Sequence, residues 1–239
     1  MIKYGIVSTI ANEIDNLEKY INALVKSTKS YDVTIFLVFD KICTDGSYQL
    51  SLALENKFLN LKTLFCKNST CPTDSYFFGF NEAFDNGCDW IIDINGGFRH
   101  NPTEIIRFIR AIQGQTKFVL GSRFTKKTEN SFSNFQRYFL SYYGTKVSNK
   151  LLNMDLSDLT SGFHLMHKDC IKHLNEKKVK SKYHFLQTEM RYLLCKKFVY
   201  KVVPISYSSS SKSLKIKVII EAMFLLLYYS FVEYFGNEQ

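Results

Sequence analysis

Apolar and polar positions follow a regular order along the first half of the chain. Short apolar runs of strand length occur at 2–10, 33–39, 61–66, 89–94 and 117–121. Between them lie segments with apolar residues at helical spacing, at 16–27, 47–58, 75–86 and 103–113. Strands that alternate with helices form parallel sheets with right-handed crossovers. The pattern therefore predicts an α/β fold, with a Rossmann-like, mostly parallel sheet flanked by helices.

The second half is less regular. Helical spacing predicts helices at 135–152, 168–174 and 185–196, and apolar runs predict strands near 163–166 and 200–204. Pro204 lacks an N–H group, so the last of these strands is expected at an edge of the sheet. Polar stretches at 123–134 and 206–213 are expected to be loops. No internal repeat or linker appears, which favours one domain at 1–217 with a terminal helix at 218–239.

The terminal segment 218–235 approaches the roughly 20 residues that a membrane-spanning helix needs. Glu221 and Glu233 argue against a span, and Lys212, Lys215 and Lys217 just ahead of it suit anionic headgroups. We therefore expect an amphipathic helix at the membrane interface. The alternative is a helix buried against the domain or against a second copy of the chain, which leaves a homodimer open.

Composition narrows the class of partner. The chain of 239 residues has a net charge of +9 and 46% hydrophobic residues, so it is a folded protein with an anionic partner. Nucleotide phosphates and an anionic membrane fit, whereas a nucleic-acid binder would need aromatic and basic residues interleaved on an exposed sheet. Six cysteines without a CxxC pair and a start that leads directly into a strand predict a reducing, cytoplasmic setting.

The segment 90–102 is the central candidate site. Its apolar run ends at Gly96 and Gly97, and Pro102 then begins a helix. A polar loop at the carboxyl end of a central strand is where open α/β sheets bind ligands. Asp93 lies on the strand just before this loop, and the question it raises is whether it holds a metal ion.

Four short motifs occur in the order typical of a known family: Asn12-Glu13, Asp40 followed by Thr44-Asp45-Gly46-Ser47, Gly121-Ser122-Arg123-Phe124, and Asp158-Leu-Thr-Ser-Gly-Phe163. From residue 6 to about 226 the chain resembles family 2 glycosyltransferases, above all the dolichyl-phosphate mannose synthases and their bacterial polyprenyl-phosphate relatives. The resemblance implies a GT-A fold and an inverting sugar transfer from a nucleotide-sugar. It also implies that the base and ribose lie among Thr9, Ala11, Glu13 and Asp40. The alternative role for Asp40 and Asp45 is turn and helix capping.

The candidate site departs from the family at its metal-binding acids. Aligned without gaps on the family's Asp-Ala-Asp-x-x-His-x-Pro, the chain has Asn95 and Gly97 at the two acids, while His100 and Pro102 match. The resemblance implies Mg²⁺ or Mn²⁺ here, with Asp93 and Asn95 as the remaining ligand candidates. Alternatively, Asp93 is a buried, hydrogen-bonded strand carboxylate. Fixed cations such as Arg99 would then share or replace the metal's role at the diphosphate.

The acceptor side depends on basic residues. The resemblance places Arg123 and Arg137 at the lipid phosphate or the diphosphate, and Lys212 in a loop near the acceptor. Asp158 is either a general base or a residue that shapes the turn and orients Arg123. A lipid phosphate needs no base because it is already ionised, whereas a sugar hydroxyl would need Asp158 or Glu189.

These inferences lead to two functional hypotheses. The first is a glycosyltransferase, peripheral to the inner face of the membrane, that moves a sugar from a nucleotide-sugar to a polyprenyl phosphate or a lipid-linked glycan. The second is a nucleotide-sugar-binding protein that has lost catalysis, as the replaced acids at 95 and 97 would allow.

Overall fold

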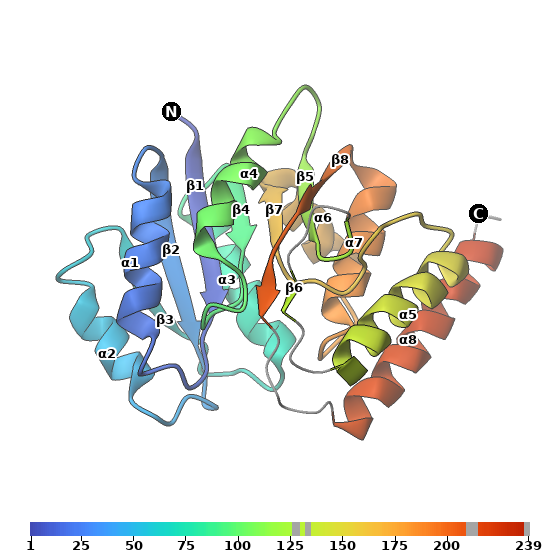
Figure 1. Ribbon diagram of the computed structural model, residues 1–239, viewed down its shortest axis with the longest axis horizontal. Coiled ribbons are helices and arrows are strands. Elements are labelled where there is room, and N and C mark those ends of the chain that lie inside the picture. The colour runs from blue at the N-terminus through green and yellow to red at the C-terminus, as the bar shows by residue number, and fades with distance from the viewer. Residues whose placement is uncertain (126–129, 132–134, 209–214, 237–239) are drawn as a thin grey trace.

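The chain folds into a seven-stranded mixed sheet with helices on both faces, as the computed structural model in Figure 1 shows. The structure describes residues 1–125, 130–131, 135–208 and 215–236, and of 130–131 and 135–137 it describes only the backbone. The strand order is β3-β2-β1-β4-β7-β5-β8, and a separate two-stranded sheet joins β6 to β9. The predicted α/β class with a mostly parallel sheet is confirmed.

The elements have the following bounds. The strands are β1 (Lys3–Thr9), β2 (Asp32–Phe39), β3 (Leu61–Phe65), β4 (Trp90–Asp93), β5 (Phe118–Ser122), β6 (Asn130–Ser131), β7 (His164–His167), β8 (Tyr200–Pro204) and β9 (Tyr207–Ser208). The helices are α1 (Leu17–Thr28), α2 (Ser47–Leu54), α3 (Pro72–Asp85), the 3₁₀ turn η1 (Pro102–Glu104), α4 (Ile105–Arg110), α5 (Phe135–Leu151), α6 (Lys168–Lys177), α7 (Leu186–Lys197) and α8 (Ile216–Phe235).

Strand β7 is the exception to the parallel pattern. It runs antiparallel between β4 and β5, so that its first residue, His164, pairs with Asp93 at the end of β4. Strand β8 lies at the edge beside β5, as Pro204 predicts. The carboxyl ends of β1, β2, β4 and β5 and the start of β7 therefore meet at one edge of the sheet, which we call the carboxyl edge.

Alternate residues of the buried strands pack on opposite faces. Ile6 and Ile35 belong to a core under α1 and α4, whereas Val7 and Phe36 belong to a second core under α3, α6 and α7. Both faces of β1 and β2 are thus covered, which explains why these strands are almost continuously apolar.

Several helix boundaries differ from the sequence prediction. Helix α3 begins at Pro72, three residues before the predicted start at 75, because Asp74 and Cys71 form a capping box and Pro72 suits the first turn. Helix α4 ends at Arg110, three residues earlier than expected.

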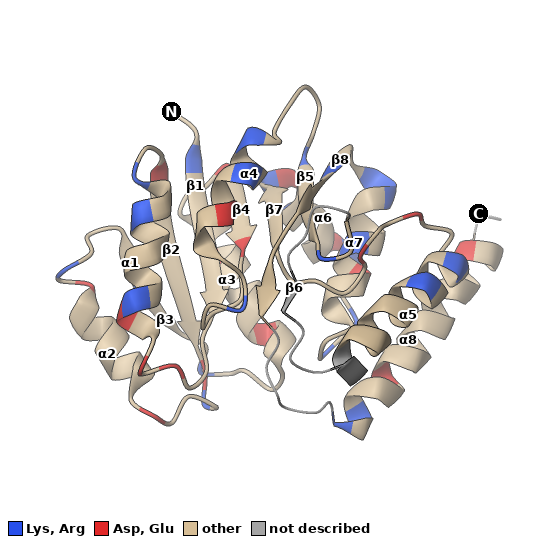
Figure 2. Ribbon diagram, viewed as in Figure 1, with Lys and Arg blue, Asp and Glu red and all other residues tan. Residues whose placement is uncertain are grey.

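Helices α5 and α8 lie side by side beyond the β8 end of the sheet (Figure 1). Leu225 and Tyr229 of α8 pack on Leu152, Phe185 and Tyr192, which makes a small third core. The remaining apolar residues of α8 face solvent, as do several of α5, and Figure 2 shows few charged residues along either helix. The predicted C-terminal helix is confirmed, but it is less amphipathic than expected because its exposed side is also apolar.

Candidate functional site

Two loops at the carboxyl edge are tied together by side-chain hydrogen bonds. Asn12 Oδ1 accepts from the Thr44 amide at 2.8 Å, and Asp45 Oδ2 accepts from the Ile14 amide at 3.0 Å. The Glu13 amide donates to Ser47 Oγ at 3.0 Å. These contacts hold the loop after β1, and with it Ala11 and Glu13, against the turn that precedes α2.

Asp40 is buried at the end of β2 and makes turn contacts. Its carboxylate accepts from the Ile42 amide at 2.9 Å and from Ser75 Oγ at 2.8 Å. Asp45 likewise accepts from the amide of Ser47 at 3.0 Å, at the start of α2. Turn formation and capping, the alternative role given to both acids, is thus present in the structure, and their predicted contact with the nucleotide stays a prediction.

Asn95 is held at the carboxyl edge by two tyrosines. Its Oδ1 accepts from Tyr76 at 2.9 Å, and its backbone oxygen accepts from Tyr20 at 3.4 Å. Tyr20 also lies 3.0 Å from Ser8 Oγ. Thr9 contributes a hydrogen bond to Tyr76, so that the end of β1 and the loop after β4 share one polar network.

Gly97 has a backbone conformation that excludes most other residues. Its φ is +73°, in the left-handed region. A Cβ atom built on Gly97 would lie 2.4 Å from Glu13 Oε1, so the Glu13 carboxylate occupies the space that a side chain at 97 would need. Arg99 is exposed on the same loop, and its backbone oxygen accepts from the Ser208 amide at 3.0 Å.

Asp93 begins a buried chain of polar groups. His164 Nδ1 lies 3.3 Å from Asp93 Oδ2, and His164 Nε2 accepts from Arg191 Nε at 2.9 Å. Arg191 donates further to the backbone oxygens of Gly121 and Asp158. Since Nε2 accepts, Nδ1 carries the proton of a neutral imidazole. Asp93 is thus the buried, hydrogen-bonded strand carboxylate of the alternative prediction.

The burial of these hydrogen-bonded polar groups determines the charge of Asp93 and His164. Burial raises the pKa of the Asp93 carboxyl well above its ordinary value, and Arg191 only partly opposes this. Burial, with a further contribution from Arg191, lowers the pKa of His164 well below its ordinary value. A carboxyl whose ionised form is disfavoured in the fold is a poor first ligand for a cation.

Replacing Asp93 with asparagine is expected to flatten the pH dependence of stability. The unfolded carboxyl ionises above about pH 4, whereas the folded one keeps its proton to higher pH. The unfolded state therefore binds fewer protons in that window, and the free energy of unfolding of the wild type falls as pH rises through it. Urea denaturation at pH 5 and pH 8 should show a smaller decrease for Asp93→Asn than for the wild type. An equal decrease would contradict the assignment.

Arg123 and Asp158 form a buried ion pair at the end of β5. Arg123 Nε lies 2.8 Å from Asp158 Oδ2 and Nη2 lies 3.0 Å from Oδ1, and the Arg123 amide donates to Oδ2 at 3.1 Å. Burial alone would raise the pKa of Asp158, but the charge and hydrogen bonds of Arg123 hold it well below its ordinary value. Of the two roles predicted for Asp158, these contacts fit the one in which it shapes the turn and orients Arg123.

Aromatic rings surround this pair. The Arg123 guanidinium lies 5.2 Å from the ring centre of Phe124 and 5.0 Å from that of Tyr207, both within cation–π range. His100 is fully buried, with its ring 5.2 Å from Phe163 and 5.4 Å from Tyr207. Burial, with contributions from Arg123 and Arg191, lowers the pKa of His100 to about 3. His100 is therefore a neutral packing residue that joins β9 to the loop after β4.

The predicted basic acceptor residues are only partly placed. The side chain of Arg137, in α5, and all of Lys212 lie outside the described residues. Glu189, the other candidate base, is buried and accepts from the amides of Lys180 and Ser181 at 2.6 and 2.8 Å and from the hydroxyl of Tyr229.

The donor set for a divalent cation is small. No group of three His, Cys, Asp or Glu side chains converges as a metal site within the described part of the chain. Mg²⁺ and Mn²⁺ can be bound through one or two carboxylates together with substrate phosphates and water. Glu13, with a half-buried carboxylate, and Asn95, with an amide oxygen, fit this limited requirement better than Asp93.

The sequence motifs do not include Tyr20, Tyr76 or Arg191. The two tyrosines lie on helical faces that also look like ordinary core. Arg191 is fully buried in α7, and the only signal for it was a charged residue inside the predicted helix 185–196.

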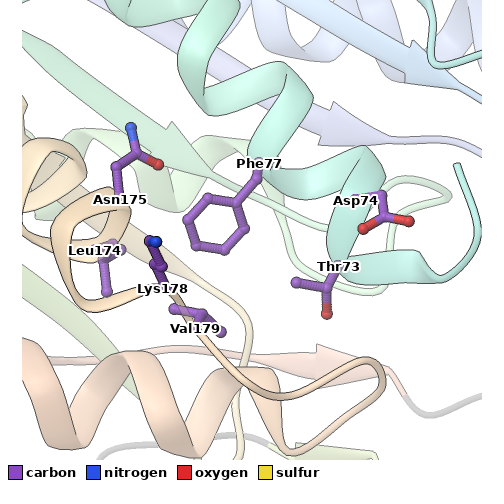
Figure 3. Close-up of a pocket in the computed structure, with 7 residues that line it drawn as sticks. All are labelled: Thr73, Asp74, Phe77, Leu174, Asn175, Lys178 and Val179. Carbon is purple, nitrogen blue, oxygen red and sulfur yellow. The ribbon is translucent and has the colours of Figure 1, made fainter. Parts of the chain in front are cut away.

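A separate groove of 210 Å³ lies between α3 and α6. Figure 3 shows the Phe77 ring between the two helices, with Lys178 and Val179 opposite. None of the predicted site residues lines it, so it is distinct from the carboxyl edge.

Converging polar loops at the carboxyl edge of a mostly parallel sheet are typical of ligand-binding α/β proteins. Comparison with known proteins specifies the family. The model of glycosyl transferase family 2 matches residues 6–174, and the chain belongs to this family. The fold is therefore GT-A and the protein is a glycosyltransferase, as predicted. The alternative of a binding protein that has lost catalysis finds no support.

One relative is similar to the chain in sequence, and two solved structures are similar to it in fold. The chain is 22% identical over 181 residues to the undecaprenyl-phosphate mannosyltransferase of Micrococcus luteus. The aligned region covers 76% of this chain and 73% of the relative. Among solved structures it resembles glucosyl-3-phosphoglycerate synthase from Mycobacterium tuberculosis in complex with Mn²⁺, UDP-glucose and phosphoglyceric acid. That match has a TM-score of 0.68 and 9% identity, and covers 96% of this chain and 80% of the other. A 4-diphosphocytidyl-2C-methyl-D-erythritol synthase from Anaerococcus prevotii matches with a TM-score of 0.55 and 16% identity, over 94% and 96% of the two chains.

Proposed function

We propose that this glycosyltransferase moves a sugar, with inversion, from a nucleotide-sugar to a polyprenyl phosphate at the inner face of the membrane. The nucleotide-sugar lies along the loops after β1, β2 and β4, where Thr9, Ala11 and Asp40 face the base and ribose. Arg99 and the backbone at Gly97 neutralise the diphosphate that leaves. The likeness to a relative named for an undecaprenyl-phosphate acceptor supports the acceptor class.

The observation that carries the acceptor assignment is that both candidate bases are already bound. Both oxygens of Asp158 accept from Arg123, and both oxygens of Glu189 accept from backbone amides. A sugar hydroxyl as nucleophile would need a base that can take its proton. A lipid phosphate is ionised at neutral pH and attacks without one, so it suits a site whose carboxylates are occupied.

A transfer assay with paired acceptors tests the function. Purified protein is incubated with radiolabelled UDP- and GDP-sugars and either undecaprenyl phosphate or a lipid-linked disaccharide. We expect labelled lipid only with undecaprenyl phosphate, as an acid-labile product. Transfer only to the disaccharide would contradict the acceptor assignment, and no transfer from any nucleotide-sugar to either acceptor would contradict the proposed function.

The surface of α5 and α8 supports the membrane part of the proposal. Within the described residues, α8 is the one helix whose length and apolar composition would allow it to cross a membrane, which a soluble core helix can also satisfy. Most of it is exposed, with apolar side chains outward that include Phe224, Leu227 and Phe231. On α5 the exposed apolar residues are Phe139, Leu140, Tyr143 and Val147. Lys215 and Lys217, both exposed, lie at the start of α8, where they would meet anionic headgroups.

Two substitutions on α8 are expected to weaken membrane binding. Leu227 and Phe231 are 62% and 64% exposed, and each contributes about 1.5–3 kcal/mol when its side chain is fully buried in an apolar phase. The double variant Leu227→Ser/Phe231→Ser should lose at least about tenfold in affinity for phosphatidylglycerol vesicles in a sedimentation assay. Leu59→Ser, which changes an exposed leucine far from α8 in the sequence, is the control and should bind like the wild type. Equal binding by all three, or a stable dimer in solution that covers α8, would contradict the interfacial role.

A further inference from the structure

The loop after β4 contains a carboxylate that comes from another part of the chain. Gly97 has no side chain, and the space beside its Cα is filled by Glu13, with Oε1, Oε2 and Cδ all within 2.5 Å of where a Cβ would lie. The two residues are 84 positions apart in the sequence. An acid is thus present at the position where the family motif has its second acid, although the sequence has glycine there.

Glu13 is held in this place by its backbone. Its amide donates to Ser47 Oγ at 3.0 Å, and its carbonyl accepts from the Asn16 amide at 3.0 Å. Ser47 Oγ in turn donates to Asp45 at 2.6 Å. The backbone of Glu13 is therefore fixed on both sides, which holds its side chain beside the loop after β4.

The Glu13 carboxylate itself is available to a ligand. It is half-buried and makes no hydrogen bond or ion pair with another residue of the described part of the chain. Most other half-buried acids around the carboxyl edge are occupied, as Asp45 is by Ser47 and the Ile14 amide. An unpaired carboxylate packed against a glycine loop repels a diphosphate unless a cation lies between them.

Asn95, two residues before Gly97 on the same loop, is the second oxygen donor of the candidate site. The Tyr20 hydroxyl donates to the Asn95 carbonyl oxygen and accepts from Ser8 Oγ. The Asn95 side chain, held by Tyr76, offers a neutral oxygen.

We propose that Glu13 is the protein carboxylate that binds the divalent cation of the nucleotide diphosphate, in place of the acid missing at position 97. This inference rests on the proposed function, because it assumes a nucleotide-sugar at the carboxyl edge. Asn95 adds a neutral oxygen, and phosphate oxygens and water complete the set that Mg²⁺ or Mn²⁺ requires. With one carboxylate instead of two, the cation is held only weakly until the nucleotide supplies its phosphates. Cation binding should therefore depend on the nucleotide.

Manganese binding measured by electron paramagnetic resonance tests the proposal without an activity assay. The full chain is titrated with Mn²⁺ alone and with Mn²⁺ plus UDP or GDP. We expect tight binding only with nucleotide, and a loss of at least about tenfold in that affinity for Glu13→Gln. Asp15→Asn removes the same charge from an exposed position in the same loop and should match the wild type.

The outcomes separate this inference from the proposed function. If Glu13→Gln binds Mn²⁺ and nucleotide like the wild type, the assignment of Glu13 is overturned and the function stands. If a chelator does not change nucleotide binding by the wild type, the assignment of Glu13 is likewise overturned and the function stands. If the wild type binds neither UDP nor GDP, with or without Mn²⁺, the proposed function fails as well. Should Glu13→Gln not fold, Glu13→Asp, which keeps the charge on a shorter side chain, is expected to show a partial loss, and full affinity there would overturn the assignment.

Discussion

Replacing Arg123 with methionine is expected to lower the free energy of unfolding by about 3–5 kcal/mol, which is typical when one partner of a buried ion pair is removed. Arg123 is 4% exposed and Asp158 is fully buried, so water cannot replace the lost guanidinium. Two side-chain hydrogen bonds to Asp158 disappear, and the carboxylate is left with its backbone donors and the nearby charge of Arg191. Urea denaturation at pH 7 measures the change.

Two further variants make this prediction specific. Lys57→Met breaks an exposed pair with Glu18, in which the side chains are 57% and 46% exposed, and should change stability by no more than about 1 kcal/mol. The double variant Arg123→Met/Asp158→Asn should recover part of the loss, since the carboxylate that has lost its partner is removed as well. If Arg123→Met costs no more than Lys57→Met, the pair does not stabilise the fold.

The pH dependence has a definite sign. Arg123 holds the pKa of Asp158 below its unfolded value, so the pair contributes its full stability above about pH 4, and that stability is lost as pH falls through the folded pKa. In Arg123→Met the buried carboxylate lacks its partner, and protonation relieves it. The difference in stability between wild type and variant should therefore shrink between pH 7 and pH 4.5.

Local hydrophobic patterns were sufficient to predict most strands of the sheet. The continuous apolar run of β2 and the strand that ends at Gly96 and Gly97 could be predicted because both faces of these strands are buried. The direction of β7 could not be predicted, because a strand of four residues has the same appearance in a parallel and an antiparallel pairing. The long connection through α5, which returns the chain to the carboxyl edge, determines it.

The candidate site could be predicted only in part from the sequence, for a similar reason. The motifs located the carboxyl edge, since three of them lie at or after the end of a strand and the fourth, 158–163, leads into β7. Whether Asp158 is free to act as a base depends on Arg123, 35 residues away, and whether an acid lies beside Gly97 depends on Glu13. Such long-range contacts leave no periodic signal, so an acid that appears to be missing from the motif could not be found elsewhere.

Gly97→Asp, which restores the acid of the family motif, is expected to destabilise the protein rather than to improve the site. Its φ of +73° costs a residue with a Cβ about 1–2 kcal/mol, and the new Cβ would lie 2.4 Å from Glu13 Oε1. The flexible Glu13 side chain can move aside at little cost, but the two carboxylates then repel each other at short distance. The melting temperature of Gly97→Asp should fall by several degrees. That is the change expected when the free energy of unfolding of a domain of this size falls by about 1–2 kcal/mol or more.

The control variant Gly87→Asp separates the cost of backbone strain from the effect of the neighbouring Glu13 carboxylate. Gly87 has a φ of +75°, and nothing lies within 4 Å of the Cβ built on it, so this variant carries the strain alone. Gly97→Asp should melt lower than Gly87→Asp, and the additional variant Glu13→Ala should return part of that difference, with a coupling of about 1 kcal/mol or more. Equal melting temperatures for the two glycine variants would mean that Glu13 is not held at position 97. Mn²⁺ binding is the last measurement on the double variant. If Gly97→Asp melts lower than Gly87→Asp and Glu13→Ala/Gly97→Asp binds Mn²⁺ with nucleotide, a carboxylate from either residue can bind the cation. The site then requires the negative charge and not a particular position in the sequence.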